Sequence, residues 1–98
     1  MHIFLTARSL KPGSYDEWRR AWEPDRWPTG SKKAYILRSL SNPDEIVAFG
    51  MFEGDVPALT SDPDLEAQQK ARLERMAPFV ASIGTDGIYE VIEEITPS

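Results

Sequence analysis

The sequence contains no cysteine and only one histidine, His2, among its 98 residues. Without cysteine the chain has no disulfide, no thiol nucleophile and no cysteine-bound zinc or iron–sulfur cluster. Carboxylates are then the main remaining metal ligands, and Asp62, Asp64 and Glu66 fit acids at the start of a helix better than a calcium loop. We therefore predict no metal ion and no bound cofactor.

Long apolar runs are also missing. No stretch approaches the roughly 20 residues of a membrane span, and residues 1–7 lack the basic and apolar segments of a signal peptide. These absences predict a cytoplasmic protein without a membrane partner. With 41% hydrophobic and 28% charged residues the composition is that of a globular protein. A chain of this length suits one small core, so we expect a single domain over residues 1–98.

Basic residues are fewer than acidic ones, eleven against sixteen, which gives a net charge of -5. An acidic chain with no basic stripe repels a polyphosphate backbone, so nucleic acid is not an expected partner. The charge is uneven, however. Residues 1–49 carry eight Lys/Arg and six Asp/Glu, whereas residues 50–98 carry three and ten. A small anion would therefore be drawn to the first half of the chain.

The apolar patterning predicts four strands and two helices. Ser14 and Glu17 form a capping box that would start the first helix, and Pro24 would stop it. The second helix would start at Asp62-Pro63, tighten at Pro78 and end at Gly84. A single helical turn is also possible over residues 55–59, and a turn over residues 84–87. The predicted strands cover residues 2–8, 34–37, 45–53 and 88–95.

The element order β-α-β-β-α-β is that of the ferredoxin-like α+β sandwich, in which both helices cover one face of a four-stranded antiparallel sheet. The strand over residues 45–53 is apolar on both faces. Its uncovered side would expose Val47, Phe49 and Met51, at a cost of about 1.5 to 3 kcal/mol each. We therefore predict a homodimer packed through the uncovered sheet face.

Three tryptophans lie within ten residues, beside three arginines: Trp18, Trp22 and Trp27 with Arg19, Arg20 and Arg26. One interpretation is that the indole rings of the first two simply pack on the sheet; the other is that they bind a ligand. His2 likewise has two interpretations, a strand-end side chain or a catalytic group, and no carboxylate partner is evident for the second.

Two small residues, Ala48 and Gly50, alternate with Phe52 on the strand that faces the helices, and they predict a pocket between sheet and helices. Arg38 and Arg8 would each meet an anionic or enolic oxygen there, or else form a surface salt bridge. We assign no catalytic residue. The full set of expected pocket residues is Trp18, Trp22, Arg38, Ala48, Gly50, Phe52, Met76 and Phe79.

The whole chain resembles the dimeric α/β barrel proteins, in particular the antibiotic biosynthesis monooxygenase-like domains. The resemblance rests on the order and spacing of four segments: Lys11-Pro12-Gly13, residues 38–44 at the hairpin, residues 49–53, and the helix that contains Pro78. It implies a ferredoxin-like protomer and a homodimer. In some members it also implies cofactor-free oxygenation of polycyclic phenols or oxidative cleavage of haem.

Haem-degrading members place an Asn near the end of the first strand, a Trp at the end of the third and an iron-ligating His on the second helix. This chain has Thr6-Ala7, Phe52 and no histidine beyond His2, so haem degradation is disfavoured. Two hypotheses remain. The protein is a cofactor-independent monooxygenase or isomerase acting on a small aromatic or enolisable compound, or it is a non-catalytic small-molecule-binding or regulatory homodimer.

Overall fold

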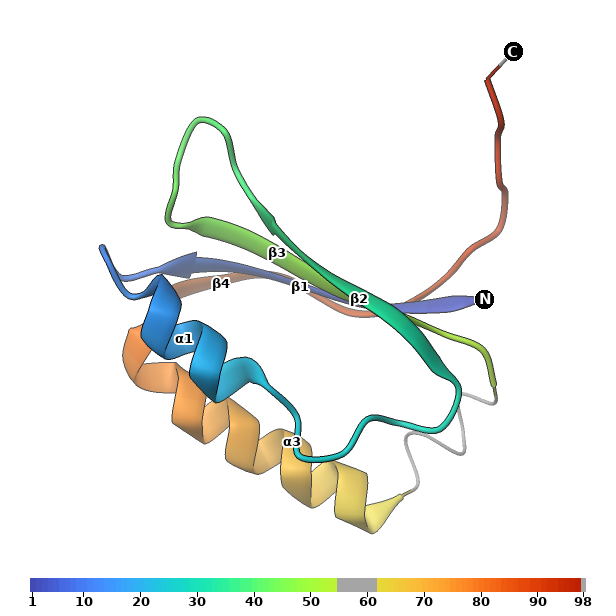
Figure 1. Cartoon of the computed structure of the whole chain (residues 1–98), viewed down its shortest axis with the longest axis horizontal. Coiled ribbons are helices and arrows are strands. Elements are labelled where there is room, and N and C mark those ends of the chain that lie inside the picture. Colours follow the sequence, from blue (N-terminus) through green and yellow to red (C-terminus); the bar gives the residue numbers. More distant parts are fainter. Residues whose placement is uncertain (55–61, 98) are drawn as a thin grey trace.

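The computed structural model describes residues 1–54 and 62–97, and the helical turn expected over residues 55–59 lies outside them. Four strands and two main helices follow one another in the predicted β-α-β-β-α-β order (Figure 1). The elements are β1 (His2–Leu10), α1 (Tyr15–Trp22), β2 (Ser31–Arg38), β3 (Glu45–Phe52), α3 (Pro63–Met76), a 3-10 turn (Ala77–Phe79) and β4 (Val80–Glu90).

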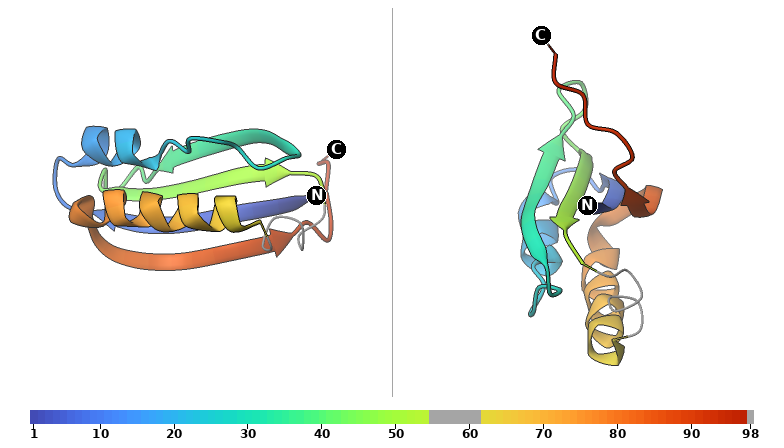
Figure 2. Two further views of the ribbon diagram at one scale, coloured as in Figure 1. Left: turned by 90° about the horizontal axis from the view of Figure 1, so that it is seen from below. Right: turned by 90° about the vertical axis from the view of Figure 1, so that its right-hand side faces the viewer.

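The strands form one antiparallel sheet in the order β2-β3-β1-β4, so β2 and β4 are its edges. Both helices lie on the same side of this sheet, and no helix within residues 1–54 and 62–97 lies on the opposite side (Figure 2). The ferredoxin-like fold class is therefore confirmed. No helix in the described ranges is long and apolar enough to cross a membrane.

Asp62 starts α3 as predicted, because its carboxylate accepts hydrogen bonds from the backbone N–H of Asp64 at 2.9 Å and of Leu65 at 3.3 Å. Desolvation tends to raise the pKa of Asp62. The two N–H donors and the guanidinium of Arg26 outweigh it, so the pKa lies below its ordinary value. The side chain of Ser14, by contrast, makes no capping hydrogen bond. The predicted capping box at the start of α1 is thus wrong, although the helix itself is present.

The end of the chain differs from the prediction. We expected the second helix to reach Gly84, but α3 ends at Met76 because Pro78 lacks the N–H that would continue it. The chain then enters β4, which spans Val80–Glu90 rather than residues 88–95. The turn predicted at residues 84–87 is also wrong. Gly84 lies in the strand, where a Cβ atom would come within 3.2 Å of the Ala7 Cβ, beside a register shift.

The core lies between the helices and the sheet. Its fully buried members are Leu10, Trp18, Ile46, Ala48 and Met76. Phe52 is equally buried but stacks on Phe4 and His2, with ring centroids 5.0 and 5.5 Å away, near the opposite end of β3. His2 is therefore occupied in an aromatic stack.

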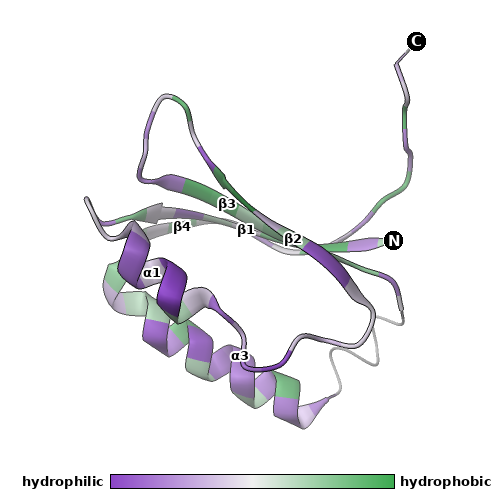
Figure 3. Cartoon of the chain, in the orientation of Figure 1, coloured by the Kyte–Doolittle hydropathy of each residue, from purple (hydrophilic) through white to green (hydrophobic). Residues whose placement is uncertain are grey.

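The helix-free sheet face is apolar, and Figure 3 shows the middle of the sheet in hydrophobic colours. Because strand side chains alternate, the neighbours of buried Ile46 and Ala48 point to this face. Tyr35 stacks on Phe49 there, with ring centroids 5.2 Å apart, and Leu37 lies beside them. Tyr35 and Leu37 remain 43% and 46% exposed, so nothing in the described chain covers them fully.

Candidate functional site

A groove of about 700 Å³ lies between α1 and β2, and we call it the α1–β2 groove. It is open to solvent and draws its walls from both elements and from the segment that joins them. Three kinds of side chain line it. The aromatic ones are Tyr15, Trp22 and Trp27; the small or aliphatic ones are Ala34 and Ile36; the polar and charged ones are Arg19, Glu23, Ser31, Lys32 and Lys33.

The Trp22 side chain is held in the groove by aromatic and cation–π contacts. Its ring meets Trp27 edge to face at 5.9 Å and lies 6.4 Å from Trp18. The guanidinium groups of Arg19 and Arg72 lie 5.1 and 5.5 Å from the Trp22 ring centroid, within cation–π range. Trp22 therefore presents a fixed aromatic surface, while Trp27 is 44% exposed at the open side.

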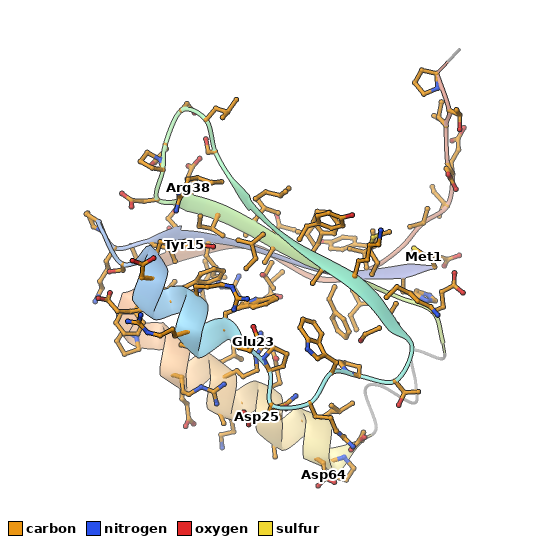
Figure 4. All side chains as sticks on the ribbon, viewed as in Figure 1. Met1, Tyr15, Glu23, Asp25, Arg38 and Asp64 are labelled. Atoms are coloured by element: carbon orange, nitrogen blue, oxygen red, sulfur yellow. The ribbon has the colours of Figure 1, made fainter. Side chains whose placement is uncertain are left out.

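The charge of the groove is positive. Arg19 Nη1 donates to Glu23 Oε2 at 2.7 Å, so the one carboxylate among the described lining residues is neutralised by a side chain of α1. Figure 4 shows Glu23 just beyond the end of that helix.

Lys32 and Lys33 are exposed at the start of β2, and within residues 1–54 and 62–97 neither forms an ion pair. Lys33 pairs with Met51 and is in phase with Tyr35 and Leu37, so its side chain belongs to the helix-free face. Lys32 is the remaining cation of the lining beside the aromatic wall.

Three of the expected pocket residues are instead parts of the core. Trp18, Ala48 and Met76 are 1%, 4% and 7% exposed and pack together, and Phe79 packs against them. The space next to Ala48 is therefore filled. Next to Gly50 it is open, since a Cβ atom there would meet no other atom within 4 Å. Gly50 pairs with the groove residue Ala34 across β2 and β3.

The other expected pocket residues are divided between the groove and its surroundings. Trp22 lines the groove directly. The Arg38 guanidinium lies 4.6 Å from the ring centroid of the groove residue Tyr15, and Figure 4 shows the two labelled side chains close together. Phe52 lies apart, in its stack with Phe4. The structure thus brings Trp22, Gly50 and Arg38 near one groove and leaves Phe52 outside it.

Sequence reasoning did not assign Lys32 and Lys33 to the site. One signal was present: they directly precede the apolar run of the second strand, in the mildly basic half of the chain and five residues after Trp27. What the sequence alone does not give is the path of residues 23–30, which returns the chain to the side of α1.

A second, much smaller cavity of about 40 Å³ lies under the helices, and Thr6, Arg8, Trp18 and Arg72 are among its walls. A polar space of this size is large enough for a water molecule. Trp18 Nε1 is buried and finds no hydrogen-bond partner within the described ranges. Burial and the neighbouring Arg75 lower the pKa of Arg72 from its ordinary value, although it stays charged at neutral pH.

Arg8 is not free to bind an anionic or enolic oxygen of a ligand, which was one of its two predicted roles. Its guanidinium is 7% exposed and donates from Nη2 to Asp86 Oδ2 at 2.8 Å and from Nη1 to the Ala7 carbonyl at 3.0 Å. It is therefore the salt-bridge partner of the other interpretation, joining β1 to β4. Among the described residues no group of three His, Asp or Glu side chains is placed to hold a metal ion.

Solved structures with a similar fold include proteins provisionally named antibiotic biosynthesis monooxygenases. The one from Deinococcus radiodurans has a TM-score of 0.67 and 17% identity over 100% of this chain and 99% of its own. The one from Bordetella bronchiseptica has a TM-score of 0.68 and 12% identity over 94% and 97%. An uncharacterized NIPSNAP domain protein from Burkholderia xenovorans reaches 0.59 at 13% identity over 100% of both chains.

No family model matches the sequence, and no curated protein matches it. At identities of this size the likeness establishes the fold. The chain therefore has the ferredoxin-like fold of antibiotic biosynthesis monooxygenase-like proteins, as the sequence resemblance implied.

Proposed function

We propose that the α1–β2 groove binds a small planar aromatic compound in its anionic form, and that this binding serves a cofactor-independent oxygenation. The observation that carries the proposal is the placement of Lys32 beside the aromatic wall of Trp22 and Trp27. Aromatic walls with a few placed cations are the features expected of a site for an aromatic enolate, phenolate or carboxylate.

The chemistry can be written without a cofactor. An enolisable CH₂ group loses a proton to solvent, and the resulting carbanion gives two electrons to O₂, forming a C–O bond. The peroxide anion takes a proton back from solvent and becomes a hydroperoxide. The hydroperoxide then loses water to leave a ketone, so that the substrate and one O₂ give the ketone and one H₂O. The ammonium group of Lys32 would favour the enolate by stabilising its oxyanion in a partly dehydrated groove.

A non-catalytic binding role is the second candidate, and one observation favours it. Glu23, the only carboxylate among the lining residues that the structure describes, is paired with Arg19 at 2.7 Å, and His2 is stacked on Phe52. Neither side chain is placed as a general base for a bound substrate. In this alternative the same aromatic anion binds, and it leaves unchanged.

Two measurements test the proposal and separate its two candidates. Quenching of tryptophan fluorescence by 2-naphthoate gives the affinity of the groove, and oxygen uptake with anthrone gives the activity. Lys32→Gln is expected to weaken 2-naphthoate binding about tenfold, whereas Lys70→Gln on the exposed side of α3 leaves it unchanged. Binding without oxygen uptake selects the non-catalytic role, and no binding at millimolar 2-naphthoate refutes both.

We also propose that the protein is a homodimer packed through the helix-free sheet face. The support is the exposed apolar surface of that face, where burying Tyr35, Leu37 and Phe49 would contribute about 1.5 to 3 kcal/mol each. Sedimentation equilibrium is expected to give a dimer at micromolar concentration. Leu37→Lys should dissociate it, whereas Leu40→Lys, on the fully exposed hairpin, should not. A monomeric wild-type protein would disprove the dimer.

A further inference from the structure

The small cavity of about 40 Å³ under the helices is bounded by three elements, β1, α1 and α3. Its polar walls are Thr6 and Arg8 from β1, Trp18 from α1, and Gln69 and Arg72 from α3. Among the described lining residues, only Trp22 also belongs to the α1–β2 groove. The cavity is therefore a second candidate site, and the function proposed above does not use it.

Hydrogen-bond donors predominate among the polar groups of this cavity. A guanidinium has five N–H groups, and hydrogen bonds within the described ranges use two of them on Arg8 and two on Arg72. The Nε1–H of Trp18 is buried and has no partner within those ranges. The amide oxygen of Gln69 can accept, but Arg72 Nη1 already donates to it at 2.6 Å. This excess of donors favours an occupant that only accepts hydrogen bonds.

The lining also carries positive charge that is not fully balanced. Arg8 is balanced by Asp86, because Nη2 of Arg8 lies 2.8 Å from Oδ2 of Asp86. Arg72 forms no ion pair in the part of the chain that the structure describes. Burial and the neighbouring Arg75 outweigh the nearby carboxylates and lower the pKa of Arg72, since both disfavour its charged form. A water molecule would leave this charge uncompensated, whereas an anion would accept the hydrogen bonds and compensate the charge.

The volume of the cavity limits the occupant to a very small species. A water molecule needs about 10 to 15 Å³ of such space, so about 40 Å³ admits one halide ion or very few water molecules. Sulfate, phosphate and aromatic carboxylates are too large. The walls include Trp18 and Met76, which are 1% and 7% exposed. Bulk water therefore screens the attraction between a bound anion and the guanidinium groups only weakly.

We propose that this cavity binds one halide ion, such as chloride, and that Arg72 and Trp18 are its principal hydrogen-bond donors. Both side chains line the cavity, and each has an N–H group that no other described residue accepts. Thr6 adds a hydroxyl that can donate, and Arg8 adds positive charge. A halide ion accepts hydrogen bonds from any direction, so it suits a site whose donors come from three separate elements.

An ion in this cavity would join β1, α1 and α3. Arg72 already donates from Nε to the carbonyl of Trp22 at 2.8 Å. A halide ion beside the same guanidinium would hold it in that position, and would thereby hold the Trp22 ring in the wall of the α1–β2 groove. Because the ion binds only the folded chain, chloride should stabilise the protein increasingly as its concentration exceeds the dissociation constant. This effect does not depend on the ligand proposed for the groove.

Thermal unfolding in mixtures of two sodium salts tests the site. The midpoint is measured from millimolar to about 0.2 M sodium chloride, with sodium gluconate added to keep the ionic strength, and so the screening of surface charges, constant. We expect the midpoint to rise with chloride concentration and to rise likewise with bromide, whereas gluconate is far too large for the cavity. Equal midpoints at every ratio of chloride to gluconate would overturn the proposal and indicate that only water occupies the cavity.

Two variants assign the chloride response to the cavity. Trp18→Phe keeps a ring in the core and removes the Nε1–H, so it is expected to raise the chloride dissociation constant about tenfold. Arg72→Met is expected to abolish the response. Arg20→Met, which removes an exposed cation of α1, is the matched control and should keep the response of the wild type. A full response in both Trp18→Phe and Arg72→Met would overturn the proposal.

The linewidth of the chloride NMR resonance measures binding to the folded protein. We expect the wild type to broaden the resonance, bromide to reverse the broadening, and Arg72→Met to broaden it much less at a temperature where circular dichroism shows that this variant is folded. Equal broadening by Arg72→Met would indicate an adventitious surface ion only, and would overturn the proposal. Lys32→Gln should weaken 2-naphthoate binding and leave the chloride broadening unchanged, so failure of the groove and failure of the halide site are distinguishable.

Discussion

The guanidinium of Arg72 donates from Nε to the backbone carbonyl of Trp22 at 2.8 Å, and so joins the middle of α3 to the last residue of α1. Arg75, one turn further along α3, donates to the carbonyls of Ala21 at 3.2 Å and Glu23 at 3.3 Å. The last carbonyls of a helix have no partner within it. The second helix thus supplies those partners, and the position of the Trp22 ring in the groove depends on α3.

Arg72→Met is expected to destabilise the protein by about 1 to 3 kcal/mol, because it removes the hydrogen bonds to Trp22 and Gln69 while keeping most of the buried stem. Urea unfolding measures the loss, and weaker 2-naphthoate quenching is expected to accompany it. Arg20→Met, at an exposed position of α1, is the control. Equal stability of the two variants would show that the contact to Trp22 contributes little.

Trp18→Ala should cost about 3 to 5 kcal/mol, since it empties the centre of the core. Trp18→Phe should cost less than half as much, because it also removes the buried Nε1–H that has no partner within the described ranges. Unfolding followed by circular dichroism avoids the change in tryptophan signal. Equal losses for the two variants would indicate that Nε1 is satisfied, for example by water in the adjoining small cavity.

Substitution by alanine should lower the stability at one glycine and leave it nearly unchanged at another. Gly30 has a φ of +90°, and a Cβ there would collide with the carbonyl of Glu53, so Gly30→Ala should lose more than about 1 kcal/mol. Gly50 has open space at the same position, and Gly50→Ala should change stability by no more than about 0.5 kcal/mol. The thermal midpoints of the two variants give the comparison, and a large loss for Gly50→Ala would mean that the space beside it is filled.

Asp86→Asn is expected to cost about 1.5 to 3 kcal/mol, because it removes the charge that faces the nearly buried guanidinium of Arg8. Arg8→Met changes the side chain more than Asp86→Asn does, but it also removes the buried charge. Its loss of stability should therefore be smaller than the change in size alone suggests. Thermal unfolding of the two single variants and of the double variant gives the coupling between them. Additive effects would show that the salt bridge does not join β1 to β4 energetically.

The pH dependence of stability should include a contribution from Asp62. Its pKa in the folded protein lies below the ordinary value of 3.8, so its contribution is complete above that value and is lost as the pH falls through the folded-state pKa. Asp62→Asn keeps a capping oxygen but no charge, and its stability should fall less steeply between about pH 5 and pH 2. Urea midpoints across that range test this, with Asp64→Asn as the control; parallel curves for wild type and Asp62→Asn would contradict it.

Element order and fold class follow from the sequence because the first three strands each have an apolar pattern and Asp62-Pro63 marks a helix start chemically. The strand at the C-terminus does not follow. Residues 80–90 contain Gly84, Gly87 and Asp86, which resemble a turn by composition. They form a strand because β1 is already in place to pair with them, and Gly84 allows the backbone to approach Ala7. That constraint is tertiary and leaves no local signal.

The sequence predicted the region of the candidate site but not which of its tryptophans is exposed there. A cluster of tryptophans beside basic residues indicated the correct region, and Trp22 lines the groove. Which indole is buried and which is exposed depends on where Leu10, Ile46 and Met76 close around the helix, and they enclose Trp18 alone. Sequence spacing places Trp18 and Trp22 on one stripe but does not distinguish them.

The pairing of β1 with β4 places His2 opposite Glu90, so β1 has one of its two neighbours far along the chain. During translation, β1, β2 and β3 can assemble early, with one side of β1 still unpaired. The sheet can close only after residues 80–90 have left the ribosome. Completion of the fold is therefore expected to be slowed by the long loop that this last pairing must close.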